Sequence, residues 1–163
     1  MEKKQSWWQG PRGEGYVIIQ FVFFGLLFFA PKTLPSWPAW SPLWSGIGVA
    51  AGFLIGGIGG LLIMAGLWNL GGNLTAVPRP KENSSMVKKG AYAIVRHPIY
   101  SGIVIGAFGW GLLQNGFLTL LYALILFIFF DIKSRHEEKW LCERYNDYPE
   151  YQKKVKKLIP FIY

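Results

Sequence analysis

The sequence from residue 43 to residue 70 reads LWSGIGVAAGFLIGGIGGLLIMAGLWNL and contains no Lys, Arg, Asp or Glu. A helix needs about 20 mainly apolar residues to cross the roughly 30 Å of bilayer hydrocarbon, so this stretch predicts a membrane span. Three shorter charge-free runs cover residues 16–30, 99–113 and 117–130, where soluble helices would show a polar face. We predict an all-α, polytopic transmembrane helical bundle of about four spans. The alternative is three spans, with residues 16–30 shallow or re-entrant.

The positive charges predict how these spans are oriented. All of the 17 lysines and arginines except Lys32 fall before the first run, between the second and third runs, or after the fourth. Four spans place these segments on one face of the membrane, and Lys and Arg collect on the cytoplasmic side. We therefore expect both termini, and a helical C-terminal segment, to be cytoplasmic. The compact chain and the lack of a targeting signal favour the inner membrane of a bacterium.

The formal net charge of +8 would also suit a nucleic-acid-binding protein. Here the basic residues flank apolar runs, where anionic lipid headgroups attract them, so membrane lipids are the expected partners and nucleic acid is not. The single cysteine, Cys142, excludes an internal disulfide, and no metal site is predicted.

Glycines recur every four residues in the second run, at Gly48, Gly52, Gly56 and Gly60. Such small-residue faces allow helix backbones to approach closely. Gly102 and Gly106 in the third run offer a matching surface. We expect packing between these helices, while the oligomeric state stays open because glycine faces also serve homodimers.

Two polar segments, residues 71–100 and 131–163, hold most of the groups able to do chemistry. Pro98 can open the third helix and leave His97 near its cap. The last helix should continue past the membrane beyond residue 131. The ends of this helical hairpin therefore bring together a set of charged and aromatic side chains: Arg96, His97, Tyr100, Lys133, His136, Glu137 and Glu138.

Three elements in this half of the chain resemble a known family. They are Gly90-Ala91-Tyr92, the stretch RHPIYSG at 96–102 and the stretch EEKWL at 137–141, followed by Tyr148, Tyr151 and Pro160. Together they resemble the isoprenylcysteine carboxyl methyltransferase family, whose pattern is shared with phospholipid methyltransferases and spans residues 69–161 here. The resemblance implies an all-helical membrane enzyme that binds S-adenosyl-L-methionine at its cytoplasmic face.

The resemblance also divides the chain and assigns its site residues. The chain would form a single membrane domain, 1–163, with an arm (1–15), two spans joined by a Pro/Trp-rich loop (16–70) and a catalytic region (71–163). Lys133, Arg96 and Glu138 would be catalytic. The cofactor-binding residues would be Ser84, Ser85, Met86, Val87, Tyr92, His97, Pro98, Ile99, Tyr100 and Glu137.

Lys133 departs from the pattern of eukaryotic members, which have arginine at the position thought to hold the substrate carboxylate. Lysine cannot reproduce the bidentate grip of a guanidinium, so a prenylcysteine carboxylate is in doubt. The methyl acceptor is expected to be lipophilic or a small hydrophobic molecule: a lipid-like carboxylate, a phospholipid amine, or a hydrophobic thiol or phenol.

Two other functions remain open from the sequence. The C-terminal region of membrane sterol reductases is similar and binds a nicotinamide dinucleotide, although those enzymes are usually much larger. A transporter or scaffold is disfavoured, because transport sites place ionisable groups within the membrane and these four runs are charge-free.

Overall fold

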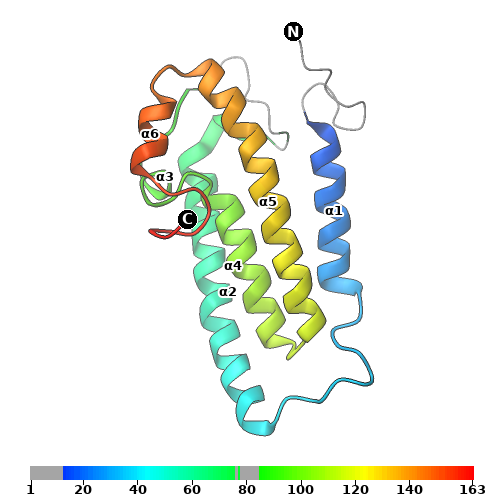
Figure 1. Cartoon of the computed structure of the whole chain (residues 1–163). Coiled ribbons are helices and arrows are strands. Elements are labelled where there is room, and N and C mark those ends of the chain that lie inside the picture. The colour runs from blue at the N-terminus through cyan, green and yellow to red at the C-terminus, as the bar shows by residue number, and fades with distance from the viewer. Residues whose placement is uncertain (1–12, 76, 78–84) are drawn as a thin grey trace.

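The computed structural model describes residues 13–75, 77 and 85–163 of the 163-residue chain. Four long helices form the bundle: α1 (Glu14–Phe29), α2 (Pro42–Leu70), α4 (Pro98–Leu113) and α5 (Phe117–Arg144). Three short ones, η2 (Gly71–Asn73), α3 (Ala91–Ile94) and α6 (Tyr148–Lys154), lie near one end (Figure 1). The predicted all-α class is confirmed for the described residues, whose only β pairing is an isolated bridge between Val95 and Lys156.

Two of these helices, α2 and α5, are long and apolar enough to cross a membrane. The other two, α1 and α4, have 16 residues each, about 24 Å at 1.5 Å per residue. Large apolar side chains such as Phe53, Leu61 and Ile128 point outward and are exposed, as expected for helices surrounded by lipid. The four-span count and the orientation stay predictions.

The tightest packing in the bundle joins α2 to α4 through glycines. A Cβ added to Gly59 would lie 2.6 Å from the carbonyl oxygen of Gly102, and one on Gly52 would lie 2.8 Å from that of Gly109. The prediction that these two helices pack together is therefore confirmed, but only part of the predicted glycine series turns its Cβ positions toward α4. The α2 residues buried on this face are Gly48, Gly52, Gly59 and Gly66.

The other two glycines of the predicted series, Gly56 and Gly60, have no described atom within 4 Å of the place where a Cβ would be, although the backbone of Gly56 does lie against α4: a Cβ on Gly109 would be 2.6 Å from its nitrogen. A step of four residues turns about 400° around an α-helix, so a four-residue series drifts by about 40° per step. A seven-residue step drifts by only about 20° in the opposite sense, which is why Gly52, Gly59 and Gly66 share one face.

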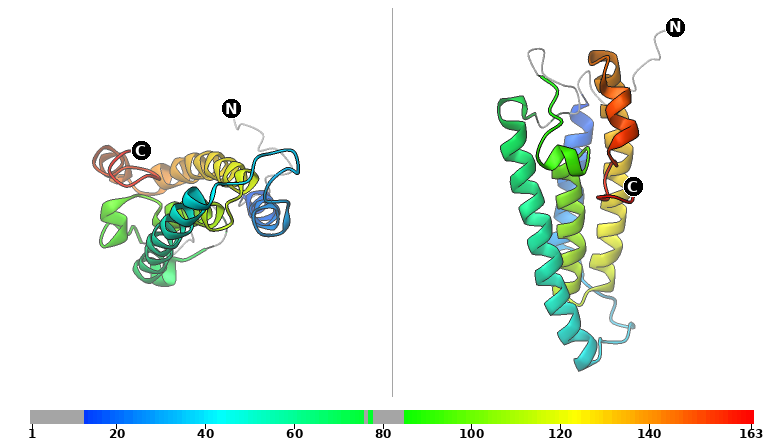
Figure 2. Two further views of the ribbon diagram at one scale, coloured as in Figure 1. Left: turned by 90° about the horizontal axis from the view of Figure 1, so that it is seen from below. Right: turned by 90° about the vertical axis from the view of Figure 1, so that its left-hand side faces the viewer.

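On the other side of the bundle, α1 lies beside α5, as Figure 2 shows from below. The rings of Phe23 and Phe129 lie 5.2 Å apart, edge to face. The α4–α5 hairpin turns at Asn115, whose φ of 49° is left-handed, as its Asn-Gly sequence predicted.

The polar segments gather at the end of the bundle where α2 ends and α4 begins (Figure 1). There the C-terminal segment turns back beside α5, and the carbonyl oxygens of Lys156 and Lys157 accept the backbone N–H groups of Arg96 and His97 at 2.8 and 3.2 Å. This strand-like contact fixes the start of α4 against the tail.

Candidate active site

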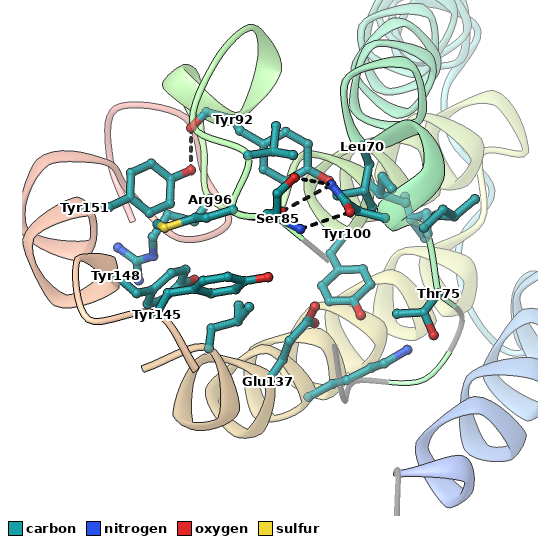
Figure 3. Close-up of a pocket in the computed structure, with 18 of the residues that line it drawn as sticks. Leu70, Thr75, Ser85, Tyr92, Arg96, Tyr100, Glu137, Tyr145, Tyr148 and Tyr151 are labelled. Atoms are coloured by element: carbon teal, nitrogen blue, oxygen red, sulfur yellow. Dashed lines mark hydrogen bonds between the residues drawn. The ribbon is translucent and has the colours of Figure 1, made fainter. Parts of the chain in front are cut away.

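A cavity of about 270 Å³ lies among these segments, and almost every element contributes to its wall (Figure 3). Side chains from α1 and from α5 close one side, the loop after η2 another, and α6 a third. Its lining includes nine of the thirteen residues predicted for the site: Ser85, Met86, Val87, Tyr92, Arg96, Ile99, Tyr100, Lys133 and Glu137.

Helix α5 presents Lys133, Glu137 and Leu141 to the cavity. They follow one another at intervals of four residues, and therefore lie on one face of the helix. The Oε2 atom of Glu137 is buried and has no hydrogen-bond partner among the described residues; Nδ1 of His97 is 3.8 Å away. Buried polar atoms are nearly always paired, so this carboxylate oxygen is suited to accept hydrogen bonds from a ligand.

His97, predicted as a cofactor ligand, is buried behind the cavity wall and does not line it. Its ring stacks on Tyr100, with centroids 5.5 Å apart and planes 4° from parallel, and Tyr100 stacks in turn on Phe130 at 4.7 Å. Pro98 also lies outside the lining, because its ring packs against Gly66 of α2. Both residues hold Tyr100 and Ile99 in place rather than face the cavity themselves.

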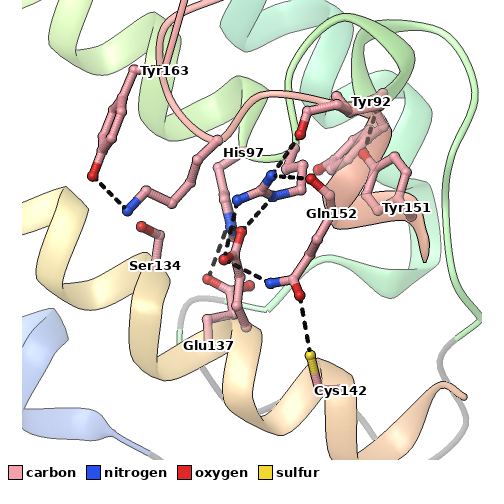
Figure 4. Close-up of polar contacts among 12 residues, drawn as sticks. Tyr92, His97, Ser134, Glu137, Cys142, Tyr151, Gln152 and Tyr163 are labelled. Atoms are coloured by element: carbon pink, nitrogen blue, oxygen red, sulfur yellow. Dashed lines mark hydrogen bonds and ion pairs between the residues drawn. The ribbon is translucent and has the colours of Figure 1, made fainter. Parts of the chain in front are cut away.

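Glu138 points away from the cavity, although it follows Glu137 directly. Arg96 donates from Nε to Oε1 of Glu138 at 2.7 Å and from a terminal nitrogen to Oε2 at 3.2 Å. Nε2 of His97 lies 3.0 Å from Oε1, and the amide of Gln152 donates to Oε2 at 3.0 Å (Figure 4). This network joins α4, α5 and α6 and forms one wall of the site, with Arg96 alone of its members lining the cavity.

Lys133 is almost fully buried, at 1% exposure. Its ammonium donates to Oε1 of Gln20 on α1 at 2.7 Å and lies 5.0 Å from the centroid of the Tyr100 ring. Gln20 was missed by the sequence reasoning, because the first two spans resemble the family only in general character. The available signal was that Gln20 is the only amide side chain in the run 16–30.

The middle loop reaches the cavity through Ser85, Met86 and Val87, while Ser84 lies outside the described residues. Asn73, which the sequence reasoning also missed, holds this loop: its amide oxygen accepts the N–H of Ser85 at 3.2 Å and its amide nitrogen donates to the Ser85 carbonyl oxygen at 3.2 Å. Asn69 does the same for α3 by accepting the N–H of Ala91 at 2.8 Å.

Four tyrosines form the wall at the α6 end: Tyr92, Tyr145, Tyr148 and Tyr151. The hydroxyl of Tyr151 donates to the carbonyl oxygen of Tyr92, which ties α6 to α3 (Figure 3). Burial raises the pKa of Tyr92, Tyr148 and Tyr151 far above the ordinary value. Their hydroxyls are therefore neutral and able to donate hydrogen bonds near neutral pH.

Comparison with known proteins agrees with this arrangement. Residues 47–148, well over half of the chain, match the phospholipid methyltransferase family. The chain belongs to that family. The match includes α4, α5 and the loop between α2 and α4, and so covers most of the cavity wall.

Relatives of this phospholipid methyltransferase family member include proteins named protein-S-isoprenylcysteine O-methyltransferase. The one from Schizosaccharomyces pombe is 37% identical over 69% of this chain and 49% of its own length. The one from Saccharomyces cerevisiae is 38% identical over 56% of this chain and 40% of its own. The chain thus spans about half the length of the curated relatives it matches.

A solved structure of the eukaryotic intramembrane Ras methyltransferase, isoprenylcysteine carboxyl methyltransferase, has the same fold. It aligns with a TM-score of 0.62 and 25% identity, covering 94% of this chain and 53% of that one. The resemblance drawn from the sequence is confirmed, and this family member is an integral membrane protein.

Proposed function

We propose that this protein transfers a methyl group from S-adenosylmethionine to a lipophilic acceptor. The observation that carries the proposal is the buried, unpaired Oε2 of Glu137 in a cavity rich in tyrosine. The amino and hydroxyl groups of that cofactor are donors that a carboxylate accepts, and the tyrosine rings and Leu141 suit its adenine and carbon chain. The family membership and the names of the relatives support the same assignment.

The residues of this chain would act mainly by positioning. The bound cofactor supplies a methyl group on a sulfonium, which is already a good leaving group. What remains is to hold an acceptor atom about 3–3.5 Å from that carbon and in line with the bond that breaks. Lys133 and Gln20, at the α1 side of the cavity, are placed to orient the acceptor. Arg96 and Glu138, predicted as catalytic, would act as positioning residues that keep α5 and α6 in register.

The acceptor would reach the cavity from the bilayer beside α1. Phe21 lines the cavity and is also 65% exposed on the outer surface of the bundle, and Val17 lines the same side. An apolar molecule could therefore pass from lipid to Lys133 without crossing water, while the water-soluble cofactor would enter at the loop end. The lysine, a point charge, accommodates acceptors other than a carboxylate that needs a bidentate partner.

Calorimetric titration of the detergent-purified protein with S-adenosylmethionine tests the donor. We expect saturable binding, weakened about 10- to 100-fold by Glu137→Gln, because hydrogen bonds to a charged group contribute roughly 1.5–3 kcal/mol. Glu143→Gln is the matched control, since Glu143 is exposed on the same helix and does not line the cavity. Binding of NADPH instead of S-adenosylmethionine would move the protein to the reductases.

A further inference from the structure

A second hollow, of about 440 Å³, opens on the outer side of the Arg96–Glu138 wall. Its surface is formed by the end of α6, the C-terminal segment and one turn of α5. We call it the C-terminal hollow and define it by six of its lining residues: Arg135, Lys153, Lys156, Lys157, Ile162 and Tyr163. We infer that the C-terminal hollow binds the phosphate group of an anionic phospholipid, a role independent of methyl transfer.

The first argument is charge. Besides the four basic residues of the definition, Arg96 also lines the hollow, and among the described residues Glu138 is the only acidic one that does so. Glu138 is already engaged by Arg96 and His97. At the edge, Asp131 pairs with Arg135 and Lys157, and Glu150 pairs with Lys153. The five basic residues that line the hollow therefore outnumber the three carboxylates of Glu138, Asp131 and Glu150 by two.

The second argument is the position of the hollow along α5. Asp131 is the first charged residue after the charge-free run 117–130, and Arg135 follows one turn later. The ring of Tyr163 lies 6.3 Å from that of Phe127, inside the apolar run. The C-terminal segment thus reaches from the charged turn of α5 toward the apolar run, and the right-hand view of Figure 2 shows it descending from α6 beside α5. If the charge-free run 117–130 spans the bilayer, as the sequence predicts, the hollow lies at the level at which lipid headgroups meet hydrocarbon.

The third argument selects a lipid over free phosphate. Phe161 and Ile162 are 81% and 74% exposed, and Ile162 belongs to the hollow. On α5, Ile128, Ile132 and Arg135 are spaced i, i+4, i+7 and share one helical face, and both isoleucines are exposed. A phosphate held by Arg135 and the lysines would leave an acyl chain to lie along this apolar surface.

The test is a lipid titration of the delipidated full-length protein, followed by native mass spectrometry. We expect phosphatidylglycerol to bind more tightly than phosphatidylcholine, and the double variant Lys153→Gln/Lys156→Gln to lose that preference. Each lysine near an anionic surface contributes roughly a factor of five, so the double variant should bind phosphatidylglycerol about 25-fold more weakly. Lys139→Gln/Lys154→Gln is the matched control: it removes two exposed lysines outside the hollow and should keep the preference.

Two further experiments distinguish a phospholipid from a water-soluble phosphate as the occupant of the C-terminal hollow. Glycerol 3-phosphate should compete weakly, and Ile162→Ser should weaken the lipid but not glycerol 3-phosphate. Equal binding of the two lipids, equal loss in both double variants, or glycerol 3-phosphate binding as tightly as the lipid would each overturn the inference. Thermal unfolding of each variant shows that it is folded, so a loss of binding reports on the hollow.

Discussion

The two sides of the bundle are built differently. Between α2 and α4 the backbones approach closely at glycines, whereas α1 packs against α5 through large side chains such as Phe23 and Phe129. The start of α4 carries Ile99 and Tyr100 into the cavity, and α1 carries Gln20. A close backbone interface would give a rigid wall for the proposed cofactor, which must bind in one place. The side-chain interface at α1 leaves that wall easier to move, which suits entry of a lipid acceptor.

The largest effect is expected from filling the α2–α4 interface. In Gly59→Ala the new Cβ would meet backbone atoms of α4 at 2.6 Å, which cannot move aside without shifting the helix. We expect a loss of about 2–3 kcal/mol in the free energy of unfolding, measured by denaturant titration in detergent. The matched variant Gly60→Ala meets no atom within 4 Å and should be neutral or slightly stabilising, because alanine favours helix over glycine.

Equal stability of Gly59→Ala and Gly60→Ala would contradict the claim that the α2–α4 interface is close-packed and rigid. The two substitutions are identical in chemistry and one residue apart, so intrinsic helix propensity cannot account for a difference between them.

A smaller effect is expected at the other side of the cavity. Lys133→Met removes the ammonium that we propose orients the acceptor, and should raise the KM for acceptor about tenfold with little change in the Kd for S-adenosylmethionine. Methionine fills a similar volume, and one charged hydrogen bond is worth roughly 1.5–3 kcal/mol. A loss of cofactor binding as large as that of Glu137→Gln would show that Lys133 belongs to the cofactor subsite instead.

Gln20→Leu tests the same side of the cavity with a smaller change than Lys133→Met. It removes the hydrogen bond that fixes the ammonium of Lys133 but leaves the charge. We expect a two- to tenfold rise in the KM for acceptor, in line with about 0.5–1.5 kcal/mol for one hydrogen bond. An unchanged KM, alongside a raised one in Lys133→Met, would mean that Lys133 is positioned without α1.

The smallest effect concerns the loop that follows residue 84. Lys88 is bonded to Asp147 at the start of α6, and this contact lowers the pKa of the Asp147 carboxyl. The Lys88–Asp147 ion pair is therefore present above the ordinary aspartate pKa and is lost as the pH falls through the lowered pKa of Asp147. Because both groups are exposed, Asp147→Asn should change cofactor affinity less than twofold near neutral pH. A larger change in cofactor affinity, measured by calorimetry, would show that the Lys88–Asp147 ion pair helps to close the cavity.

The sequence predicted the helical bundle and the polar end because both depend on one-dimensional patterns: charge-free runs and clustered basic residues. It could not decide which face each helix turns inward. Glu137 and Glu138 are neighbours, yet about 100° of rotation separates them on α5, so one faces the cavity and the other pairs with Arg96. For the same reason the predicted four-residue glycine series included Gly60, which has no described atom within 4 Å of its Cβ position.

Gln20 shows a different limit. It comes from a helix far away in the sequence, and only the packing of α1 on α5 brings it to Lys133. A local motif cannot report such a contact. The residues of α4 and α5, by contrast, belong to one hairpin, which brings Ile99, Tyr100, Lys133 and Glu137 to the cavity. The other five predicted residues that line it come from the segment just before α4.

The most direct test of the account is methyl transfer itself. The protein, in lipid nanodiscs, would be incubated with S-adenosylmethionine labelled in its methyl group and with three lipophilic acceptors in turn: a prenylcysteine, a phosphatidylethanolamine and a hydrophobic thiol. We predict that label appears in at least one extracted acceptor, that Glu137→Gln lowers it about 10- to 100-fold at subsaturating cofactor, and that Glu143→Gln retains it. Saturable cofactor binding without label in any acceptor, or equal label from Glu137→Gln and Glu143→Gln, would contradict the proposed site.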